Sequence, residues 1–451
     1  MKLIYNIADR PRMPRLIVFA IQQLLAIMAA TLVVPVIIGN GMSPSAALFG
    51  AGIGTIVYLL FTGFKSPVFL GSSFAFIGSM IAAFAGAATT QLGYLGLIIG
   101  TVLAGLVYVI IAIIVKFVGV NWLNKLMPPV VIGPTVAIIG LSLAGNAVSD
   151  LSNQSNAAAT PLNVWMFIIC GLVTLAVVIL CSTYGKKTLK LIPFIVGILS
   201  GYALAVILTV IGSAAGIDSL KVVDFSAFKA LFAEGVQLSS FVQVPDFTFL
   251  TAFGAFDKLD ASYIVTIAAA YVPVAFVVFA EHIADHKNIS SIIEKDLLED
   301  PGLHRTLLGD GVGSMAGAFF GGCPNTTYGE SVACVAITGN ASVVTIFAAA
   351  IGAILIAFLS PFVAFVNSIP SCVMGGVCIA LYGFIAVSGL KMIQKVDLEQ
   401  HKNLFVVSVI LICGIGGLTF SFGKVSITSI ACALILGILT NVLVSKAKED
   451  K

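Results

Sequence analysis

The sequence predicts an all-α polytopic membrane protein that crosses the bilayer fourteen times, as two inverted repeats of seven segments. Three observations lead to this fold class: the apolar composition, the placement of the basic residues, and short motifs that recur in both halves of the chain. Of the 451 residues, 59% are hydrophobic and 10% are charged, with a mean hydropathy of +1.11. This composition excludes a soluble protein, and a net charge of +3 shows none of the basic excess typical of nucleic-acid binding.

Apolar segments of about 20 residues can span a bilayer, and the chain contains fourteen candidates. The first, residues 16–39, is too long for a signal-peptide core and lacks a small-residue cleavage site, so we expect it to be a retained helix. The eight cysteines follow no CxxC spacing and indicate no redox role. The segments are expected to begin near Leu16, Ser45, Val68, Gly93, Pro129, Val164, Ile192, Ser262, Thr306, Cys323, Ala341, Pro370, Asn403 and Val425.

The basic residues favour this number of crossings and one orientation. With a cytoplasmic N-terminus and fourteen segments, nineteen of the 23 Lys and Arg residues fall on the cytoplasmic side. Only Lys221, Lys229, Lys258 and Lys424 fall outside. Because positively charged loops are retained in the cytoplasm, both termini are expected there, and the protein is expected in the cell membrane.

Two motif pairs indicate internal symmetry. Seven segments on each side of the midpoint would place the halves in opposite orientations, which is the plan of many secondary transporters. Chance similarity between apolar segments is the alternative. The first pair is Pro128-x-x-Val131-x-Gly133 and Pro370-x-x-Val373-x-Gly375, and the second is Ser72-Ser73-Phe74-Ala75 and Thr326-Thr327-Tyr328-Gly329.

Both members of the second pair occur where an apolar segment is interrupted by Pro and Gly. Pro67 and Gly71 precede Phe74, while Pro324 and Gly329 flank Tyr328. Extended backbone at membrane depth is tolerated only inside protein or along a cavity. We therefore expect each interruption to lead into a short half-helix whose N-terminal amides point to a central site. Two ordinary loops at the membrane surface are the alternative.

Two glutamates lie beside these interruptions. Glu281 follows the apolar residues 262–280, and Glu330 follows Gly329. Ionisable groups within membrane segments are costly and indicate a functional site. Carboxylate acceptors next to amide donors suit a small planar molecule that carries both N–H and C=O groups, such as a nucleobase, and would repel an anion. An apolar wall disfavours an ionised carboxylate, so we expect Glu281 to hold a proton and to couple it to transport. A solvated carboxylate at a cytoplasmic helix end is the alternative.

Several longer motifs resemble one known family. They are Ala280-Glu281-His282, residues 295–305, residues 324–330, Gln22-Gln23, residues 71–76 and Leu381-Tyr382-Gly383. Together they are similar, nearly end to end, to the nucleobase-ascorbate transporter (nucleobase:cation symporter) family, and most similar to its bacterial uracil-permease branch.

The resemblance implies a core domain (residues 1–120 and 262–368) that moves against a gate domain (residues 121–261 and 369–451), often as a homodimer. It implies no cofactor, with a proton as the coupling ion. The position of Ser331, which replaces an amide of the family signature, belongs to the same site. The substrate-binding residues that the resemblance implies are Glu281, Glu330, Phe74, Gly329, Tyr328, Ala30, Tyr382 and Ser331.

Other positions depart from the family pattern or leave alternatives open. Ala333 replaces a signature glycine, which, like Ser331, puts the specificity of the site in question. Asp285, where uracil permeases can have His, and Asp310 are expected to take part in proton coupling; a solvated helix-end acid and a capping role, respectively, are the alternatives. His282 and His286 have the i, i+4 spacing of a metal site, but the HExxH motif of a membrane metalloprotease is absent.

The sequence thus predicts a secondary active transporter, not an enzyme. Its substrate is expected to be a nucleobase, in the first place uracil, imported with protons across the bilayer. A purine permease of the same family and an anion transporter of the same fold are the alternatives. Residues 215–261 form the longest stretch without a crossing, and the sequence assigns no role to them.

Overall fold

The computed structural model describes residues 3–119, 122, 126–152, 161–186, 188–422 and 425–445. Helices make up most of these residues, and two small antiparallel sheets accompany them. The predicted domain boundary at residues 120–121 lies outside the described residues. So do seven of the basic residues used to predict orientation: Lys2, Lys125, Lys187, Lys424, Lys446, Lys448 and Lys451.

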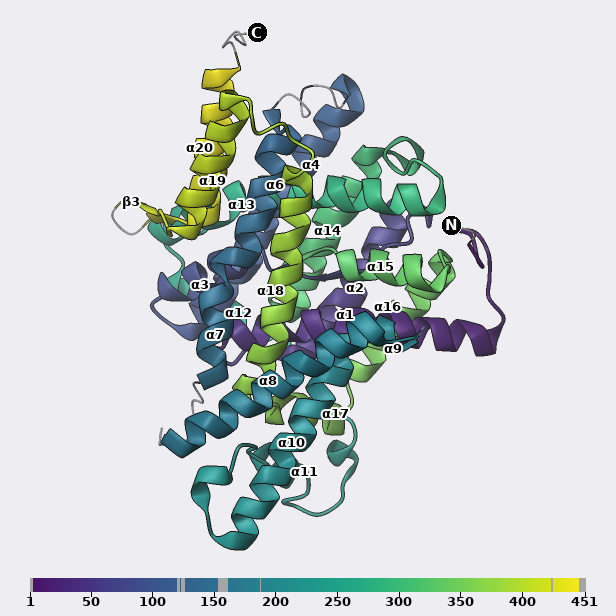
Figure 1. Ribbon diagram of the computed structural model, residues 1–451, viewed down its shortest axis with the longest axis vertical. Helices are drawn as coiled ribbons and strands as arrows, with labels where there is room; N and C mark the ends of the chain where they lie inside the picture. Colours follow the sequence, from purple (N-terminus) through teal and green to yellow (C-terminus); the bar gives the residue numbers. More distant parts are fainter. Residues whose placement is uncertain are drawn as a thin grey trace.

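Short helices are interspersed among the long helices of the chain (Figure 1). The first half contains α1 Met13–Ile38, α2 Pro44–Phe61, β1 Leu70–Ser72, α3 Ile77–Ala85, α4 Thr90–Val118, α6 Pro129–Ser142, α7 Ala144–Ser152, α8 Pro161–Tyr184, α9 Thr188–Leu191, α10 Pro193–Ala215, η1 Asp218–Leu220, α11 Ser226–Leu231, η2 Leu238–Ser240, α12 Thr248–Ala252 and η3 Phe253–Lys258. The second half contains α13 Ala261–Ile293, η4 Leu298–Gly302, α14 Leu303–Gly321, β2 Asn325–Thr327, α15 Gly329–Thr338, α16 Val343–Ala357, α17 Ser360–Ser368, α18 Ser371–Ile393, α19 His401–Ile415, β3 Phe420–Phe422, β4 Val425–Ile427 and α20 Ser429–Val444.

Within the described residues, 8 helices are long and apolar enough to cross a bilayer, with α6 and α7 counted as one. This is the pattern of a multi-pass membrane protein. Each of the fourteen apolar segments predicted from the sequence contains a helix, although several of these helices are too short to cross alone.

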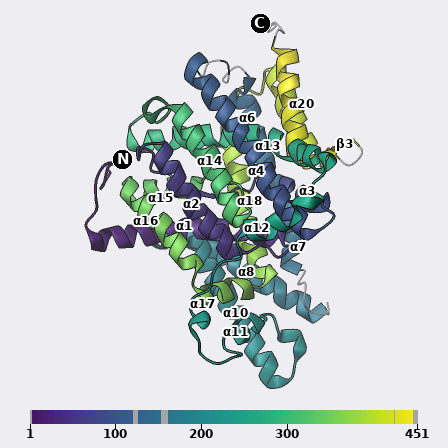
Figure 2. The same cartoon turned by 180° about the vertical axis from the view of Figure 1, so that it is seen from behind.

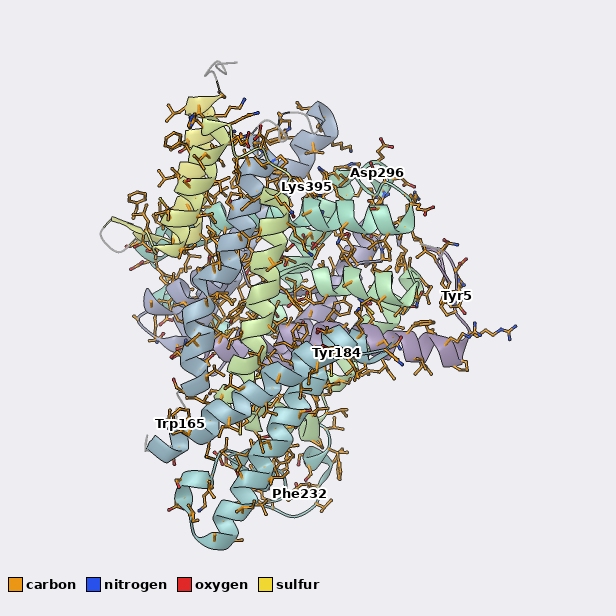
Figure 3. The ribbon with its side chains drawn as sticks, in the orientation of Figure 1. Tyr5, Trp165, Tyr184, Phe232, Asp296 and Lys395 are labelled. Atoms are coloured by element: carbon orange, nitrogen blue, oxygen red, sulfur yellow. The ribbon has the colours of Figure 1, made fainter. Side chains whose placement is uncertain are left out.

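The most exposed long helices carry apolar side chains outwards. In α8, Trp165 is 62% exposed and Tyr184 is 76% exposed, and these two aromatic residues lie near opposite ends of the helix (Figure 3). Aromatic side chains gather at the two water interfaces of a membrane protein. The outer face of α8 therefore has the length and the ends expected of a lipid-facing surface.

The helices pack in two groups. One contains α1, α2, α4, α13, α14 and α16, with the α2–α14 and α4–α14 pairs at its centre. The other contains α6, α7, α8, α10, α18, α19 and α20, in which α18 packs on α6, α7 and α8. Figure 2 shows from behind that α19 and α20 stand at one edge, while α8, α10 and α11 form the opposite end. The two groups meet along α1, α13 and α18.

The two interrupted segments meet as a buried antiparallel pair of strands. Leu70 pairs with Thr327, Gly71 with Thr326 and Ser72 with Asn325. All six residues are buried, so the alternative of two surface loops is wrong. Each strand leads into a short helix, β1 into α3 and β2 into α15. The pair thus holds two helix N-termini, from distant parts of the chain, next to each other.

The strand pair extends beyond its own residues. The amide of Ser73 donates to the carbonyl of Pro324 at 2.8 Å, and the amide of Tyr328 donates to the carbonyl of Phe69 at 3.2 Å. The Tyr328 hydroxyl donates to the Ser72 carbonyl at 2.6 Å. A Cβ at Gly71 would overlap the ring of Tyr328, so only glycine leaves room for the ring. Buried backbone groups need such partners because no water reaches them.

Glycines allow α2 and α14 to approach closely on the outer side of this strand pair. A Cβ at Gly54 would lie 2.7 Å from the carbonyl oxygen of Gly313, and one at Gly50 would collide with the carbonyl of Gly317. The gap that remains is filled by Asn325, whose side-chain amide donates to the Gly50 carbonyl at 3.0 Å. Close contact between small residues is a main source of helix association in membranes.

An ion-pair cluster joins two connections outside the helices. Lys295, after α13, lies 2.7 Å from Oδ2 of Asp300, and Lys65, before β1, lies 2.6 Å from Oδ1. Hydrogen bonds from Lys295 and Lys65 lower the pKa of Asp300 to about 2. All three side chains are nearly half exposed, so the cluster orients the connections and adds little to stability.

Replacing Gly54 with Ala is expected to destabilise the protein by about 1–3 kcal/mol, because the added methyl group would force α2 away from the Gly313 carbonyl. Thermal unfolding in detergent measures the effect. Gly145→Ala is the matched control, since a Cβ at this helical glycine in α7 would meet no atom within 4 Å. Equal melting temperatures for the two variants would contradict the packing argument.

Candidate binding site

A cavity of about 410 Å³ lies between the two groups of helices. One wall comes from α13 and α15, and the opposite wall from α6, α10 and α18, with α1 at the side. Its size falls within the range of small-molecule sites. The lining residues are Ala26, Val136, Ser182, Lys190, Pro193, Phe194, Glu281, Ala284, Asp285, Asn288, Gly329, Glu330, Ala333, Cys334, Ile337, Phe384, Ile385, Ser388 and Met392.

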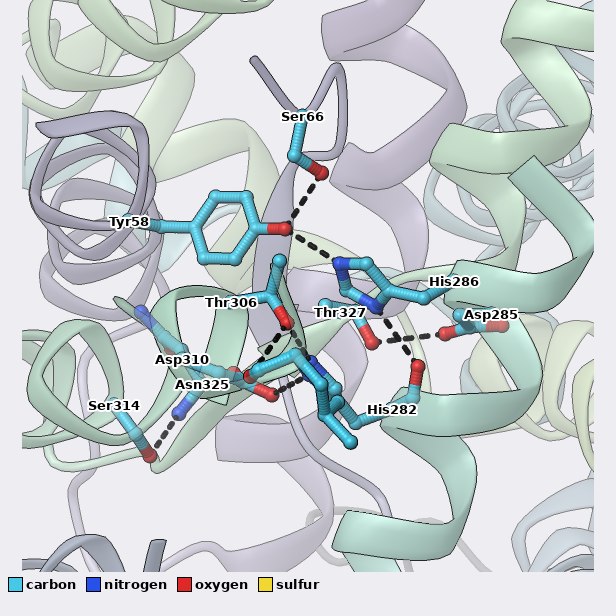
Figure 4. A network of polar contacts seen from close by, with 11 residues as sticks. Tyr58, Ser66, His282, Asp285, His286, Thr306, Asp310, Ser314, Asn325 and Thr327 are labelled. Atoms are coloured by element: carbon cyan, nitrogen blue, oxygen red, sulfur yellow. Dashed lines mark hydrogen bonds and ion pairs between the residues drawn. The ribbon is translucent and has the colours of Figure 1, made fainter. Parts of the chain in front are cut away.

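Three carboxyl groups face this cavity. Glu281 and Asp285 are four residues apart on α13 and therefore lie on one face of the helix, while Glu330 is in the first turn of α15. Oδ2 of Asp285 accepts a hydrogen bond from the Thr327 hydroxyl at 3.0 Å (Figure 4). Glu281 lies well inside α13, which continues to Ile293, so the alternative of a solvated acid at a helix end is wrong for both Glu281 and Asp285.

The N-terminus of α15 supplies hydrogen-bond donors to the same wall. Gly329 is the first residue of α15 and lines the cavity, and the first amides of a helix have no intrahelical acceptor. The strand pair fixes where these amides point, because β2 ends two residues earlier. Amide donors beside carboxyl acceptors form an edge that complements a neutral heterocycle with both N–H and C=O groups. Three acids make the same wall unfavourable for an anion.

Four other predicted site residues are buried beside the cavity and do not line it. Ala30 lies on α1 one turn beyond the lining residue Ala26, and Tyr382 lies on α18 just before Phe384. The rings of Phe74 and Tyr382 meet edge to face, with centroids 5.8 Å apart. Tyr328 is held by its bond to Ser72. Ala30 and Tyr382 are thus near neighbours, along their helices, of residues that line the cavity.

Ser331 acts behind the wall. It is fully buried, and its hydroxyl oxygen accepts hydrogen bonds from the side-chain amide of Gln23 and, at 3.0 Å, from the backbone amide of Phe69. It thereby connects α1, the residue before β1, and the first turn of α15. The amide that the family signature has at this position is expected to order the site. The contacts of Ser331 are consistent with that role.

A buried polar network lies behind the Asp285 side of the cavity (Figure 4). Nδ1 of His282 is 2.7 Å from Oδ2 of Asp310, and Nε2 is 3.0 Å from the Thr306 hydroxyl. Asp310 does not reach the cavity, and it lies in the middle of α14, so a capping role is wrong. Within the described residues, no group of three or more His, Cys, Asp and Glu side chains forms a possible metal site.

Hydrogen-bond accounting assigns a proton to this network. The Thr306 hydroxyl donates to the Leu303 carbonyl at 3.0 Å, so it accepts from His282, whose Nε2 therefore carries hydrogen. The 2.7 Å contact between Nδ1 and Asp310 also requires a proton between its two atoms. His282 and Asp310 together therefore hold that proton, and the pair is neutral as a whole.

The second histidine extends the network towards β1. Nδ1 of His286 donates to the His282 carbonyl at 2.8 Å, and Nε2 lies 2.7 Å from the Tyr58 hydroxyl, which is also 2.7 Å from the Ser66 hydroxyl. The i, i+4 spacing revealed that the histidines share a face, but not which partners they have. The sequence analysis also missed Lys190, the one basic side chain among the described lining residues, because nothing local distinguishes it from other loop lysines.

Comparison with known proteins supplies independent information. A model of the Permease family, of the xanthine and uracil type, matches residues 14–422. The chain is 37% identical to a uracil permease of Bacillus subtilis over 100% of this chain and 97% of that relative. It is 40% identical to one of Bacillus caldolyticus (98% and 95%) and 35% identical to one of Escherichia coli (96% and 92%).

Solved structures with the same fold are more distant in sequence. The transmembrane domain of a cyanobacterial bicarbonate transporter superimposes with a TM-score of 0.62 at 15% identity, covering 97% of this chain and 100% of that one. The murine Solute Carrier 26 family member A9 anion transporter, in the inward-facing state, gives 0.64 at 10% identity, with 97% and 69% covered. At these identities the likeness concerns the fold alone.

Removing the hydroxyl of Ser331 is expected to leave two buried donors, on Gln23 and Phe69, without an acceptor. Each unsatisfied donor costs about 1–3 kcal/mol, so Ser331→Ala lowers the melting temperature. Ser200→Ala is the control, because Ser200 donates only to Val196 in its own helix. The same small change in both variants would show that Ser331 does not hold the wall together.

Proposed function

The chain belongs to the nucleobase-ascorbate transporter family of permeases, and from this we propose that it is a membrane transporter that imports uracil together with protons. A permease moves its substrate without altering it, so the protein is not an enzyme. The observation that carries the proposal is the convergence of Glu281, Glu330 and the N-terminus of α15 on one cavity.

The pyrimidine ring of uracil alternates N–H and C=O groups along one edge. In the proposed complex Glu281 and Glu330 accept from the N–H groups, while amides at Gly329 and Phe74 donate to the carbonyl oxygens. Ala30, Tyr328 and Tyr382 provide the apolar and aromatic walls, and Ser331 orders the site from behind. The contact between Phe74 and Tyr382 supports this arrangement, because it brings residues of both helix groups to the end of the cavity.

Proton coupling is assigned to three acids. Glu281 carries the coupling proton and contacts the base, so binding of the proton and binding of the base depend on each other. Asp285 exchanges this proton with the open part of the cavity, and Asp310 takes part through its neutral pair with His282. No further cofactor is required for this chemistry.

We assign the movement to a core domain, residues 1–120 and 262–368, that shifts against a gate domain, residues 121–261 and 369–451. The two groups of packed helices follow this division, and the cavity lies between them. Fourteen crossings in a 7+7 inverted repeat, with β1–α3 and β2–α15 as the broken crossings, account for the short helices. Both termini then lie in the cytoplasm of a cell-membrane protein, and a homodimer would cover part of the exposed apolar surface.

A purine permease is the second candidate. The cavity of about 410 Å³ is roomy, and Ala333, which departs from the family signature, lines it. Transport of an anion, as named for the structural neighbours, is disfavoured by the three acids of the wall.

Uptake of labelled uracil into proteoliposomes with an inward proton gradient tests the proposal. Accumulation that a protonophore abolishes and xanthine does not inhibit is expected. Uptake of xanthine in place of uracil would favour the purine permease. Uracil accumulation that the protonophore does not reduce would exclude proton coupling.

Glu281→Gln is expected to abolish gradient-driven accumulation, because the variant cannot carry the coupling proton and a carboxamide replaces the carboxyl contact to the base. The lost contact alone corresponds to about a ten- to hundredfold decrease in affinity. Glu299→Gln, on the exposed connection after α13, is the control and keeps wild-type uptake. Normal accumulation by a stably folded Glu281→Gln protein would contradict proton coupling through Glu281.

Glu330→Gln keeps the size of the side chain but replaces an acceptor with an amide that also donates. We expect weaker uracil uptake, by about tenfold, and better competition by purines. Competition by uracil, xanthine and hypoxanthine measures the change. An unaltered competition profile would place Glu330 outside the contact with substrate.

A further inference from the structure

A second, smaller cavity lies between the same two helix groups. Its volume is about 170 Å³, and it is open on one side. Three helices line it: α1 from one group, and α7 and the start of α18 from the other. The lining residues are Val33, Val36, Ile37, Asn146, Ser149, Asp150, Ser371 and Met374.

The two cavities lie at opposite ends of one seam. Along α1, Ala26 lines the larger cavity and Val33 the smaller one, a separation of about 10 Å at 1.5 Å per residue. Along α18, Phe384 lines the larger and Met374 the smaller, about 15 Å apart. The order is opposite in the two helices, so α1 and α18 run in opposite directions between the two cavities.

Buried side chains lie between the two cavities along both helices. On α1 they include Ala30, and on α18 they include Tyr382, whose ring meets Phe74 edge to face. All three side chains are buried. These three are proposed substrate-binding residues, and a molecule that passes along the seam from one cavity to the other meets the Phe74 and Tyr382 rings as a barrier.

The smaller cavity has the chemistry of the larger one. Asp150 is half-buried in its wall and, within the described residues, makes no hydrogen bond or ion pair. The first residue of α18, Ser371, brings a hydroxyl group and a helix N-terminus to the same space, and Asn146 adds an amide. Val33 and Met374 supply apolar walls. A carboxyl acceptor thus faces donors across the smaller cavity, as Glu281 faces the start of α15 in the larger one.

We propose that the smaller cavity is a transit site, where a neutral planar heterocycle with N–H and C=O groups binds before it crosses the Phe74–Tyr382 barrier. Asp150 accepts from the N–H group and Ser371 donates to the carbonyl. The site opens on the side opposite the start of α1, which is the outer face in the proposed orientation. The inference rests on the proposed function and adds a second binding step to it.

Transport kinetics give the first test. Asp150→Asn is expected to raise the KM for external uracil about tenfold, because the asparagine amide is a weaker acceptor than the carboxylate. Asp257→Asn, at an exposed position before α13, removes a charge without touching the cavity and leaves KM unchanged. An unchanged KM in a stably folded Asp150→Asn protein would overturn the transit site, while failure of the wild type to take up uracil would overturn the proposed function.

Labelling gives a second test that separates the two cavities. Val36, which lines the smaller cavity, is replaced by Cys in the Glu281→Gln background, where the main site binds uracil more weakly. External uracil is expected to protect this cysteine from a membrane-impermeant maleimide, and adding Asp150→Asn is expected to remove the protection. Labelling that uracil does not slow, or that occurs only from the inner side, would contradict the assignment.

Discussion

The pairing of β1 with β2 is the constraint on which the site depends. Six buried residues form this pair, and the hydrogen bonds from Ser73 and Tyr328 continue it at both ends. Backbone in an apolar interior must find partners within the protein, and here each interrupted segment satisfies the other. The strand pair therefore fixes the position of the start of α15, whose free amides face the cavity.

Small residues make this arrangement possible. Gly71 leaves space for the ring of Tyr328, and the glycines of α2 and α14 let the two helices close over the strands. Asn325 ties the second strand to α2 through the Gly50 carbonyl. The strands, the helix pair and the N-terminus of α15 are therefore joined by direct contacts.

Charge is arranged asymmetrically around this unit. Glu281, Asp285 and Glu330 line the cavity, whereas the acid behind them, Asp310, is neutralised within its pair with His282. A carboxyl group that lines the cavity can exchange protons with its contents, while Asp310 shares its proton with His282. The two cavities along the seam each combine an acid with a helix start, Glu281 with α15 and Asp150 with α18.

The sequence by itself determined the class of protein and the principal acids. Hydropathy and the family motifs are local properties, so they were sufficient to predict a multi-pass permease and to select Glu281, Glu330 and Gly329, which the structure brings to one cavity. Only the tertiary structure decided the partners: the register of β1 on β2, the role of Ser331 behind the wall, the pairing of His282 with Asp310, and the position of Asp150. These contacts join residues far apart in the chain, and their geometry depends on how helices pack, which no local pattern specifies.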